Sequence, residues 1–130
     1  MSERNPFEIL GSDKVPDQKG TPVTEKDKTG ELNERIERLI ASSPVFLFMK
    51  GSPEMPQCGF SANVVGILSS LQVPYKTFDI LSDMDIRQGV KEYANWPTFP
   101  QLWIKGQLVG GNDIISEMHQ VGELEKLLSE

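Results

Sequence analysis

Residues 50–61 read KGSPEMPQCGFS and contain the chain's one cysteine, Cys58. Apolar residues fill positions 45–49 just before this stretch, which predicts a buried strand. After the cysteine, apolar residues recur with helical spacing from Phe60 to Leu71. Cys58 is therefore predicted to lie where a strand leads into a helix, close to the N-terminus of that helix.

This position has consequences for the chemistry of the Cys58 thiol. The unpaired N–H groups and the dipole of a first helical turn favour negative charge, so they favour the thiolate. The thiolate is both the nucleophilic form of cysteine and the form that binds metals, and Lys50 adds a positive charge nearby. The alternative is an inert, buried cysteine. The irregular loop with Pro53 and Pro56 argues against that alternative, as does Gly59, which permits a close approach of the backbone.

Length, composition and charge limit the class of protein. The chain has 130 residues, of which 38% are hydrophobic, as expected of one globular domain with an extension. A net charge of −6 argues against general binding to nucleic acids or membrane surfaces. No apolar run approaches the roughly 20 residues that cross a bilayer. A single cysteine is consistent with a reducing compartment, and we expect a cytoplasmic location.

Residues 1–30 differ in composition from the rest of the chain. They contain three prolines and three glycines and few apolar residues, which predicts a flexible N-terminal extension. The start lacks the basic and apolar parts of a secretory signal, and it has too many acidic residues for a transit peptide. We therefore expect residues 31–130 to form the functional domain.

The remaining segments predict an α/β fold. The expected order is α-β-α-β-α-β-β-α, which gives a four-stranded mixed sheet with helices on both faces. The helices are expected at 31–41, from Cys58 to about 71, from Ser82 or Asp83 onward, and from Asn112 to the end, and the strands at 45–49, 75–80, 102–104 and 107–109.

Several motifs resemble those of one family. The sequence CGFS at 58–61 resembles the active-site motif of the monothiol glutaredoxins, and the loop before it is similar to the extended loop of that family. The resemblance continues through DIR at 85–87, WPTFPQ at 96–101 and GGND at 110–113, and it covers roughly residues 31–130. It implies a thioredoxin-like fold in which Pro100 follows a cis peptide bond and faces the cysteine.

The resemblance also implies a set of site residues. Cys58 is implied as the catalytic thiol and as the metal ligand, and the positions matching the family's glutathione site are Lys50, Arg87, Phe99, Asn112 and Asp113. In this arrangement, an extended peptide pairs with the backbone of Phe99, as a strand pairs with a sheet edge. Arg87 offers a bidentate fork to a carboxylate, and Asp113 accepts an ammonium group.

Each of these positions has a simpler interpretation. Asn112 or Asp113 at the start of a helix is most often an N-cap. Pro100 is also typical of the first residue of a strand. Lys50 and Arg87 are by default solvated surface charges.

Many relatives carry cysteine where this chain has Asn112, so any role of a second thiol is absent here.

The resemblance implies a [2Fe–2S] cluster as the main cargo. Such a cluster needs four ligands, usually thiolates. Two copies of Cys58 and two bound glutathiones would supply them in a homodimer bridged by the cluster, with BolA-like proteins and iron–sulfur acceptors as further partners. One alternative is an enzyme that reduces glutathione mixed disulfides through Cys58 alone. Another is an interaction module that holds no cluster.

Overall fold

The computed structural model describes the backbone of residues 25–130 and the side chains of residues 29–130. Residues 32–130 form one compact unit, to which the described residues 25–31 do not belong. The expected flexible extension therefore lies mostly outside the described residues. Its last part, from Glu25 onward, belongs to a helix.

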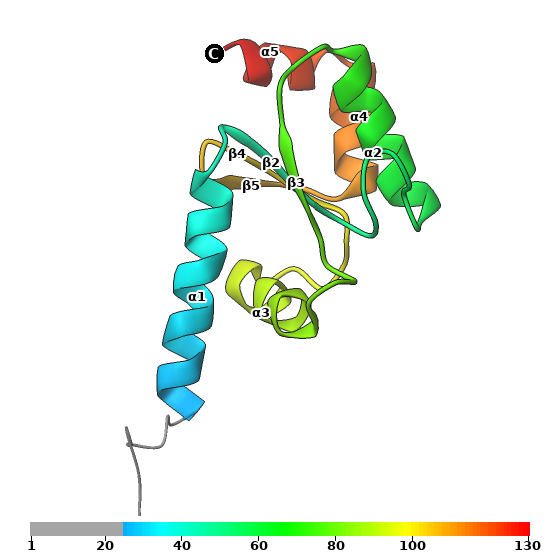
Figure 1. The fold of residues 1–130 in the computed structure, drawn as a ribbon. Helices are drawn as coiled ribbons and strands as arrows, with labels where there is room; N and C mark the ends of the chain where they lie inside the picture. Colours follow the sequence, from blue (N-terminus) through cyan, green and yellow to red (C-terminus); the bar gives the residue numbers. More distant parts are fainter. Residues whose placement is uncertain (1–24) are drawn as a thin grey trace, which may run out of the picture. The chain divides into compact units, whose positions relative to one another are not determined.

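Five helices and four strands make up the described chain (Figure 1). The strands all lie in residues 32–130, where helices and strands alternate before a closing hairpin. In chain order the elements are α1 (Glu25–Ala41), β2 (Val45–Met49), α2 (Gly59–Ser70), β3 (Lys76–Asp79), α3 (Met84–Ala94), β4 (Gln101–Ile104), β5 (Gln107–Gly110), α4 (Asn112–Gln120) and α5 (Glu123–Ser129).

The four strands form one mixed sheet in the order β3-β2-β4-β5. β2 and β3 run parallel, which requires a crossover, and α2 provides it. β2 and β4 run antiparallel, as do β4 and β5. The predicted four-stranded mixed sheet of a thioredoxin-like fold is confirmed.

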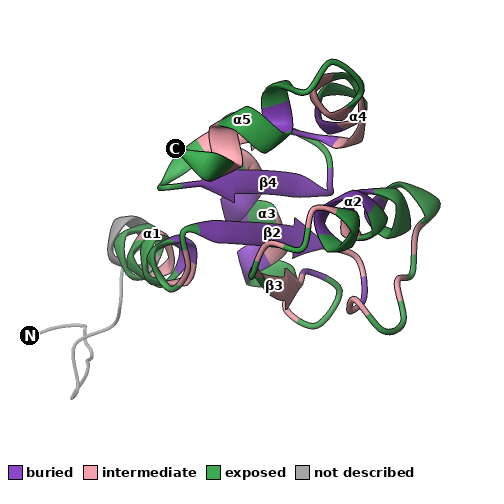
Figure 2. Cartoon of the chain, turned by 90° about the horizontal axis from the view of Figure 1, so that it is seen from above, coloured by how far each residue is buried: buried purple, intermediate pink, exposed green. Residues whose placement is uncertain are grey.

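β2 is buried on both sides, and its side chains alternate between two apolar cores. Val45, Leu47 and Met49 pack with residues of α2, α4 and α5, whereas Phe46 and Phe48 pack with residues of α1 and α3. Figure 2 shows β2 and β4 as buried throughout. This pattern confirms the prediction of helices on both faces, because a strand that is apolar at every position needs cover on each side.

Two helix boundaries differ from the predictions by more than one or two residues. α1 begins at Glu25 rather than Glu31, because its polar first turns contain no proline to stop them. The expected single C-terminal helix is instead two helices, α4 and α5, since the chain takes a left-handed conformation at Gly122 (φ 82°). The hairpin turn is confirmed, with positive φ at Lys105 (52°) and Gly106 (79°).

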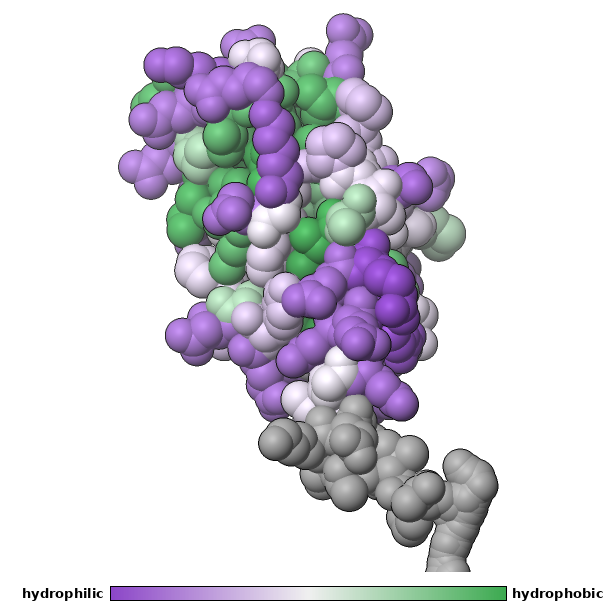
Figure 3. All heavy atoms as spheres, turned by 90° about the vertical axis from the view of Figure 1, so that its left-hand side faces the viewer, coloured by the Kyte–Doolittle hydropathy of each residue, from purple (hydrophilic) through white to green (hydrophobic). Residues whose placement is uncertain are grey.

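The surface is predominantly polar on the face that Figure 3 shows. Hydrophilic side chains cover much of this face, and hydrophobic ones are visible between them. Among the helices of residues 25–130, none combines the length and the apolar character that crossing a membrane requires.

Candidate functional site

Cys58 is the N-cap residue of α2, where the chain turns from the loop after β2 into the helix. Its backbone is extended (φ −158°, ψ 135°), and its carbonyl oxygen accepts a hydrogen bond from the N–H of Ala62 at 3.0 Å. The residue is partly buried and its thiol is free. The structure thus confirms the predicted place of the cysteine at the start of a helix.

The surroundings of Cys58 lower its pKa below the ordinary value. Partial burial raises the pKa, but the backbone N–H groups of Ser61 and Phe60, the Ser61 hydroxyl and the positive charge of Lys50 together outweigh burial. The two N–H groups belong to the first turn of α2, where helices leave donors without partners. The Ser61 side chain is held in turn, because its Oγ accepts the backbone N–H of Lys50 at 3.1 Å.

We expect the rate of Cys58 alkylation to rise with pH along a curve whose midpoint lies below that of a free cysteine. The reason is that the thiolate is the reacting species and that its formation is favoured here. Because the folded-state pKa is depressed, reactivity persists as the pH falls and is lost only below the shifted midpoint. Rates with iodoacetamide, measured on the apo protein between about pH 5 and 10, test this.

A matched pair of serine variants provides the control. Ser61→Ala removes a hydroxyl donor beside the thiol and should move the midpoint to higher pH. Ser70→Ala removes a hydroxyl at the far end of α2, where Ser70 donates to the carbonyl of Ile67, and should leave the midpoint unchanged. A wild-type midpoint at or above that of a free cysteine would contradict the prediction.

The loop after β2 is folded back on itself and anchored to β3. Gly51 adopts a φ of 90°, and a Cβ atom there would lie 2.5 Å from the carbonyl oxygen of Met55. Its N–H donates to Asp79 Oδ1 at 2.9 Å, and the N–H of Gln57 donates to the carbonyl of Lys50 at 2.8 Å. Only glycine fits at position 51 without strain, and the closed loop holds Lys50 close to the cysteine that follows.

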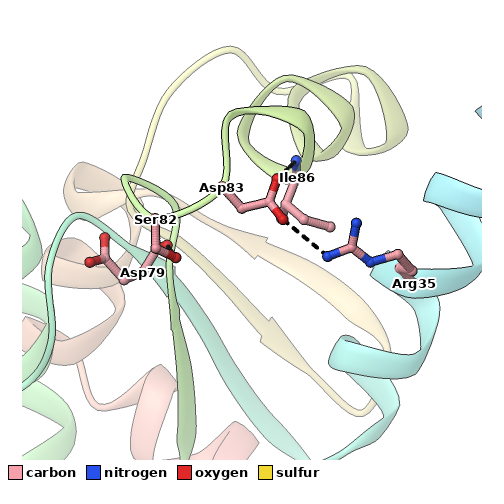
Figure 4. A network of polar contacts seen from close by, with 5 residues as sticks. All are labelled: Arg35, Asp79, Ser82, Asp83 and Ile86. Carbon is pink, nitrogen blue, oxygen red and sulfur yellow. Dashed lines mark hydrogen bonds and ion pairs between the residues drawn. The ribbon is translucent and has the colours of Figure 1, made fainter.

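The start of α3 is fixed by a side-chain cap, for which the sequence offered Ser82 or Asp83. Asp83 is the N-cap, and its Oδ1 accepts the N–H of Ile86 at 3.0 Å (Figure 4). Ser82 instead donates its hydroxyl to the carbonyl of Asp79 at 2.6 Å. The two candidates therefore have different roles, one capping the helix and the other closing the turn before it.

The Asp83 cap also fixes the position of Arg87, which lies four residues further along the chain. The Ile86 N–H and the Arg35 guanidinium lower the pKa of Asp83, and Arg35 Nη2 lies 3.0 Å from Asp83 Oδ2 (Figure 4). The backbone N–H of Arg87 donates to the carbonyl of Asp83 at 3.0 Å. Arg87 therefore lies in the first turn of α3, and Lys91 follows one turn later on the same side of the helix.

The segment between α3 and β4 carries the proline that the resemblance singled out. The peptide bond between Phe99 and Pro100 is cis, as the resemblance implied. Phe99 and Pro100 are buried, whereas Thr98 is exposed. Residues 96–100 form one wall of a pocket, and we call them the pocket loop.

This pocket has a volume of about 400 Å³ and brings together residues from five parts of the chain. The five predicted glutathione-binding residues all line it: Lys50, Arg87, Phe99, Asn112 and Asp113. Cys58 is not among the lining residues, but Phe60 in the first turn of the same helix is. The structure thus gathers the candidate residues around one cavity, beside the thiol.

Sequence reasoning missed several residues that line the pocket. Lys91 had a readable signal, since it lies four residues after Arg87 on a predicted helix. Phe60 and Ile114 gave no such signal, because apolar residues at helical spacing suggest core positions. In the structure these two residues are instead 62% and 37% exposed. The remaining lining residues lie in the WPTFPQ and GGND motifs that carried the resemblance: Trp96, Pro97, Thr98, Pro100 and Gly111.

Positive charge predominates in the pocket. Lys50, Arg87 and Lys91 line it, against the single carboxylate of Asp113. Two buried donors, Arg87 Nε and Trp96 Nε1, have no hydrogen-bond partner among the described residues. Buried donors are normally paired, so the pocket fits a ligand that carries negative charge and hydrogen-bond acceptors.

The start of α4 differs from the simple interpretation. The N-cap is Gly111 and has no side-chain cap, so the interpretation of Asn112 or Asp113 as the N-cap is wrong. The Asn112 side chain instead contacts α2, where its Oδ1 accepts Asn63 Nδ2 at 2.7 Å. The first hydrogen bond of the helix α4 runs from the N–H of Ile115 to the carbonyl of Gly111 at 3.0 Å, so the backbone N–H groups of Asn112 and Asp113 are available to an anion.

Protein groups alone do not make a metal site in the described part of the chain. No group of three or more His, Cys, Asp or Glu side chains is placed to hold a metal ion there. Cys58 is the only thiol in the sequence. One chain therefore offers a single soft ligand, and a cluster bound at this place would need ligands from outside the chain.

Comparison with known proteins agrees with these features. The family model described as Glutaredoxin matches residues 45–109. Glutaredoxin 4 of Escherichia coli is 54% identical over 97 residues, which are 75% of this chain and 84% of that protein. Monothiol glutaredoxin-S11 of rice is 56% identical over 99 residues, but this chain spans only 20% of its length.

Solved structures show the same fold. Reduced apo GrxS14 from poplar superimposes with a TM-score of 0.68 at 47% identity, covering 75% of this chain and 90% of that one. The buckwheat glutaredoxin–glutathione complex gives a TM-score of 0.71 at 25% identity, covering 82% of this chain and 94% of that one.

Proposed function

The chain belongs to the monothiol glutaredoxin family, and on this basis we propose that it binds glutathione and carries a [2Fe–2S] cluster for iron–sulfur assembly or transfer. The observation that carries the proposal is a single thiol of lowered pKa at a helix N-cap, beside a cationic pocket with unpaired donors. We propose residues 31–130 as the glutaredoxin domain, residues 1–30 as an extension, and the cytoplasm as the location.

The pocket matches the chemistry of glutathione, a tripeptide with two carboxylates and one ammonium group. Arg87 and Lys50 are suited to one carboxylate, and the backbone N–H groups of Asn112 and Asp113 are suited to the other. The carboxylate of Asp113 can accept the ammonium group, and the backbone of Phe99 can pair with the peptide. The buckwheat glutaredoxin, which has this fold, forms a complex with glutathione.

The cluster is proposed as cargo shared between two copies of the chain. Each copy supplies the Cys58 sulfur, and each bound glutathione supplies one more, which completes the usual set of four thiolates. Because the cluster and its glutathiones form the bridge, the dimer should depend on them. BolA-like proteins and iron–sulfur acceptor proteins are the proposed further partners.

A second function is favoured by the lowered pKa of Cys58, which suits nucleophilic attack. In this reaction, the Cys58 thiolate attacks the glutathione sulfur of a mixed disulfide and releases the substrate thiolate. A second glutathione thiolate then attacks the glutathione sulfur bound to Cys58, which yields glutathione disulfide and regenerates the Cys58 thiolate. The absence of a second cysteine leaves this one-thiol route as the one available.

Anaerobic reconstitution of the full chain with iron, sulfide and glutathione tests the proposed function. The expected result is a visible spectrum typical of a [2Fe–2S] cluster, with two irons for each pair of chains. Turnover of a small glutathione mixed disulfide is measured on the same protein. Rapid turnover with no cluster under any condition would reject the carrier function in favour of the oxidoreductase.

A further inference from the structure

Gln101 is a polar side chain in the interior of the protein. It is the first residue of β4, whose other residues are apolar, and it is fully buried. A buried amide costs free energy unless all its polar atoms are paired. Here it is paired: Nε2 donates to the carbonyls of Trp96 at 3.1 Å and Thr98 at 3.3 Å, and Oε1 accepts Trp103 Nε1 at 3.3 Å.

Both carbonyls that Gln101 binds belong to the pocket loop. All five residues of this loop, 96–100, line the pocket. Among residues 25–130, the two carbonyls receive no hydrogen bond other than those from Gln101. Two of the five residues are prolines, which have no N–H to anchor the backbone. Together with the N–H of Trp96, which donates to the carbonyl of Lys91 at 3.0 Å, this one side chain anchors the backbone of the pocket loop among the described residues.

Packing alone does not explain an amide at this position. An apolar residue at position 101 would continue the buried pattern of the strand. The Nε1 of Trp103 would then be the one donor that loses its acceptor. Glutamine instead offers two donors and an acceptor on one side chain, which matches the two carbonyls of the loop and the indole of Trp103. The Nε2 group donates to the pocket loop, and Oε1 accepts a hydrogen bond from Trp103 in the core.

We propose that Gln101 is a positioning residue for the glutathione pocket, which it shapes by holding the backbone of Trp96 and Thr98. This inference rests on the proposed binding of glutathione. Gln101 does not line the pocket, so it acts through the loop. The loop includes Phe99, whose backbone is the proposed partner of the bound peptide. A displaced loop would present that backbone in the wrong place.

Two variants separate the loop bonds from the core bond. Gln101→Glu keeps the shape of the side chain and an acceptor for Trp103, but it replaces the Nε2 donor with an oxygen that faces two carbonyls. Trp103→Phe is the matched control, because it removes the third hydrogen bond and leaves both loop bonds in place. Gln101→Met, which has no polar terminal group, replaces Gln101→Glu if the buried carboxyl prevents folding.

The measurement is glutathione affinity by calorimetry on the full chain, below the unfolding transition of each variant. We expect Gln101→Glu to bind glutathione about 3- to 10-fold more weakly, as expected for one or two lost hydrogen bonds, and to shift the backbone NMR signals of Thr98 and Phe99. Trp103→Phe should lose thermal stability but keep its affinity within about 2-fold. Wild-type affinity in the Gln101 variant, or an equal loss in both, would overturn the inference. A wild-type chain that does not bind glutathione would instead reject the proposed function.

Discussion

Protein that carries Cys58→Ser should retain no cluster after anaerobic reconstitution, whereas wild-type protein should retain two irons for each pair of chains. A serine hydroxyl is a poor substitute for a soft thiolate, and the chain has no other cysteine to take over. Omission of glutathione should have the same effect on the wild type although Cys58 is intact, because half of the proposed ligands are then missing. Iron analysis and the visible spectrum measure both effects.

Oligomeric state provides an independent readout of the same ligand set. If the cluster and its glutathiones form the bridge, the loaded protein should elute as a dimer, and the apo protein and Cys58→Ser should elute as monomers. Ser70→Ala, at the opposite end of α2 from the thiol, is the control and should bind the cluster like the wild type. A cluster that persists without glutathione, or a loaded monomer, would show that the ligand set is wrong.

Arg87→Ala should weaken glutathione binding by at least about 10-fold, since a hydrogen bond to a charged group contributes about 1.5–3 kcal/mol. Arg87 lies in the first turn of α3, lines the pocket, and has a buried Nε without a partner in the described chain. The variant therefore removes from the pocket lining both a charge and a buried donor that has no partner in the described chain. Calorimetric titration with glutathione measures the effect.

Two further variants define the cause. Arg87→Lys keeps the charge but loses the planar fork, so its affinity should fall between those of the wild type and Arg87→Ala. Lys76→Ala removes an exposed cation of β3 outside the pocket and should leave the affinity unchanged. An Arg87→Ala titration that matches the wild type would reject the role of Arg87 as a carboxylate anchor.

The central sheet was the part of the fold that the sequence predicted best. The boundaries of β2 agree residue for residue with the apolar run at 45–49. The strand is buried on both sides, so every residue in it is apolar and the strand ends where the apolar run does. The split between α4 and α5 was missed, since helical spacing continues through Gly122 and only the left-handed backbone there shows the break. Propensity likewise placed the start of α1 too late, because its first turns are polar on every side.

Within the site, motifs predicted more than spacing did. Five candidate binding residues came from a family resemblance, and the structure places all five around one pocket. The side-chain hydrogen bond between Asn63 and Asn112 joins α2 and α4, which are far apart in the sequence, so no local sequence pattern could predict it. Gln101 left a local signal, a polar residue beside an apolar strand, but its bonds to the pocket loop follow only from the fold.

The complete burial of β2 affects how the molecule can open. Its amides lie between two neighbouring strands and beneath helices on both faces, so they should exchange with solvent hydrogen only when the whole unit unfolds. The loop that leads to Cys58 begins immediately after this strand and is held by a few bonds, such as that from Gly51 to Asp79. The end of the loop that carries Cys58 can thus fluctuate locally, while its first residues remain attached to β2, the most protected strand of the protein.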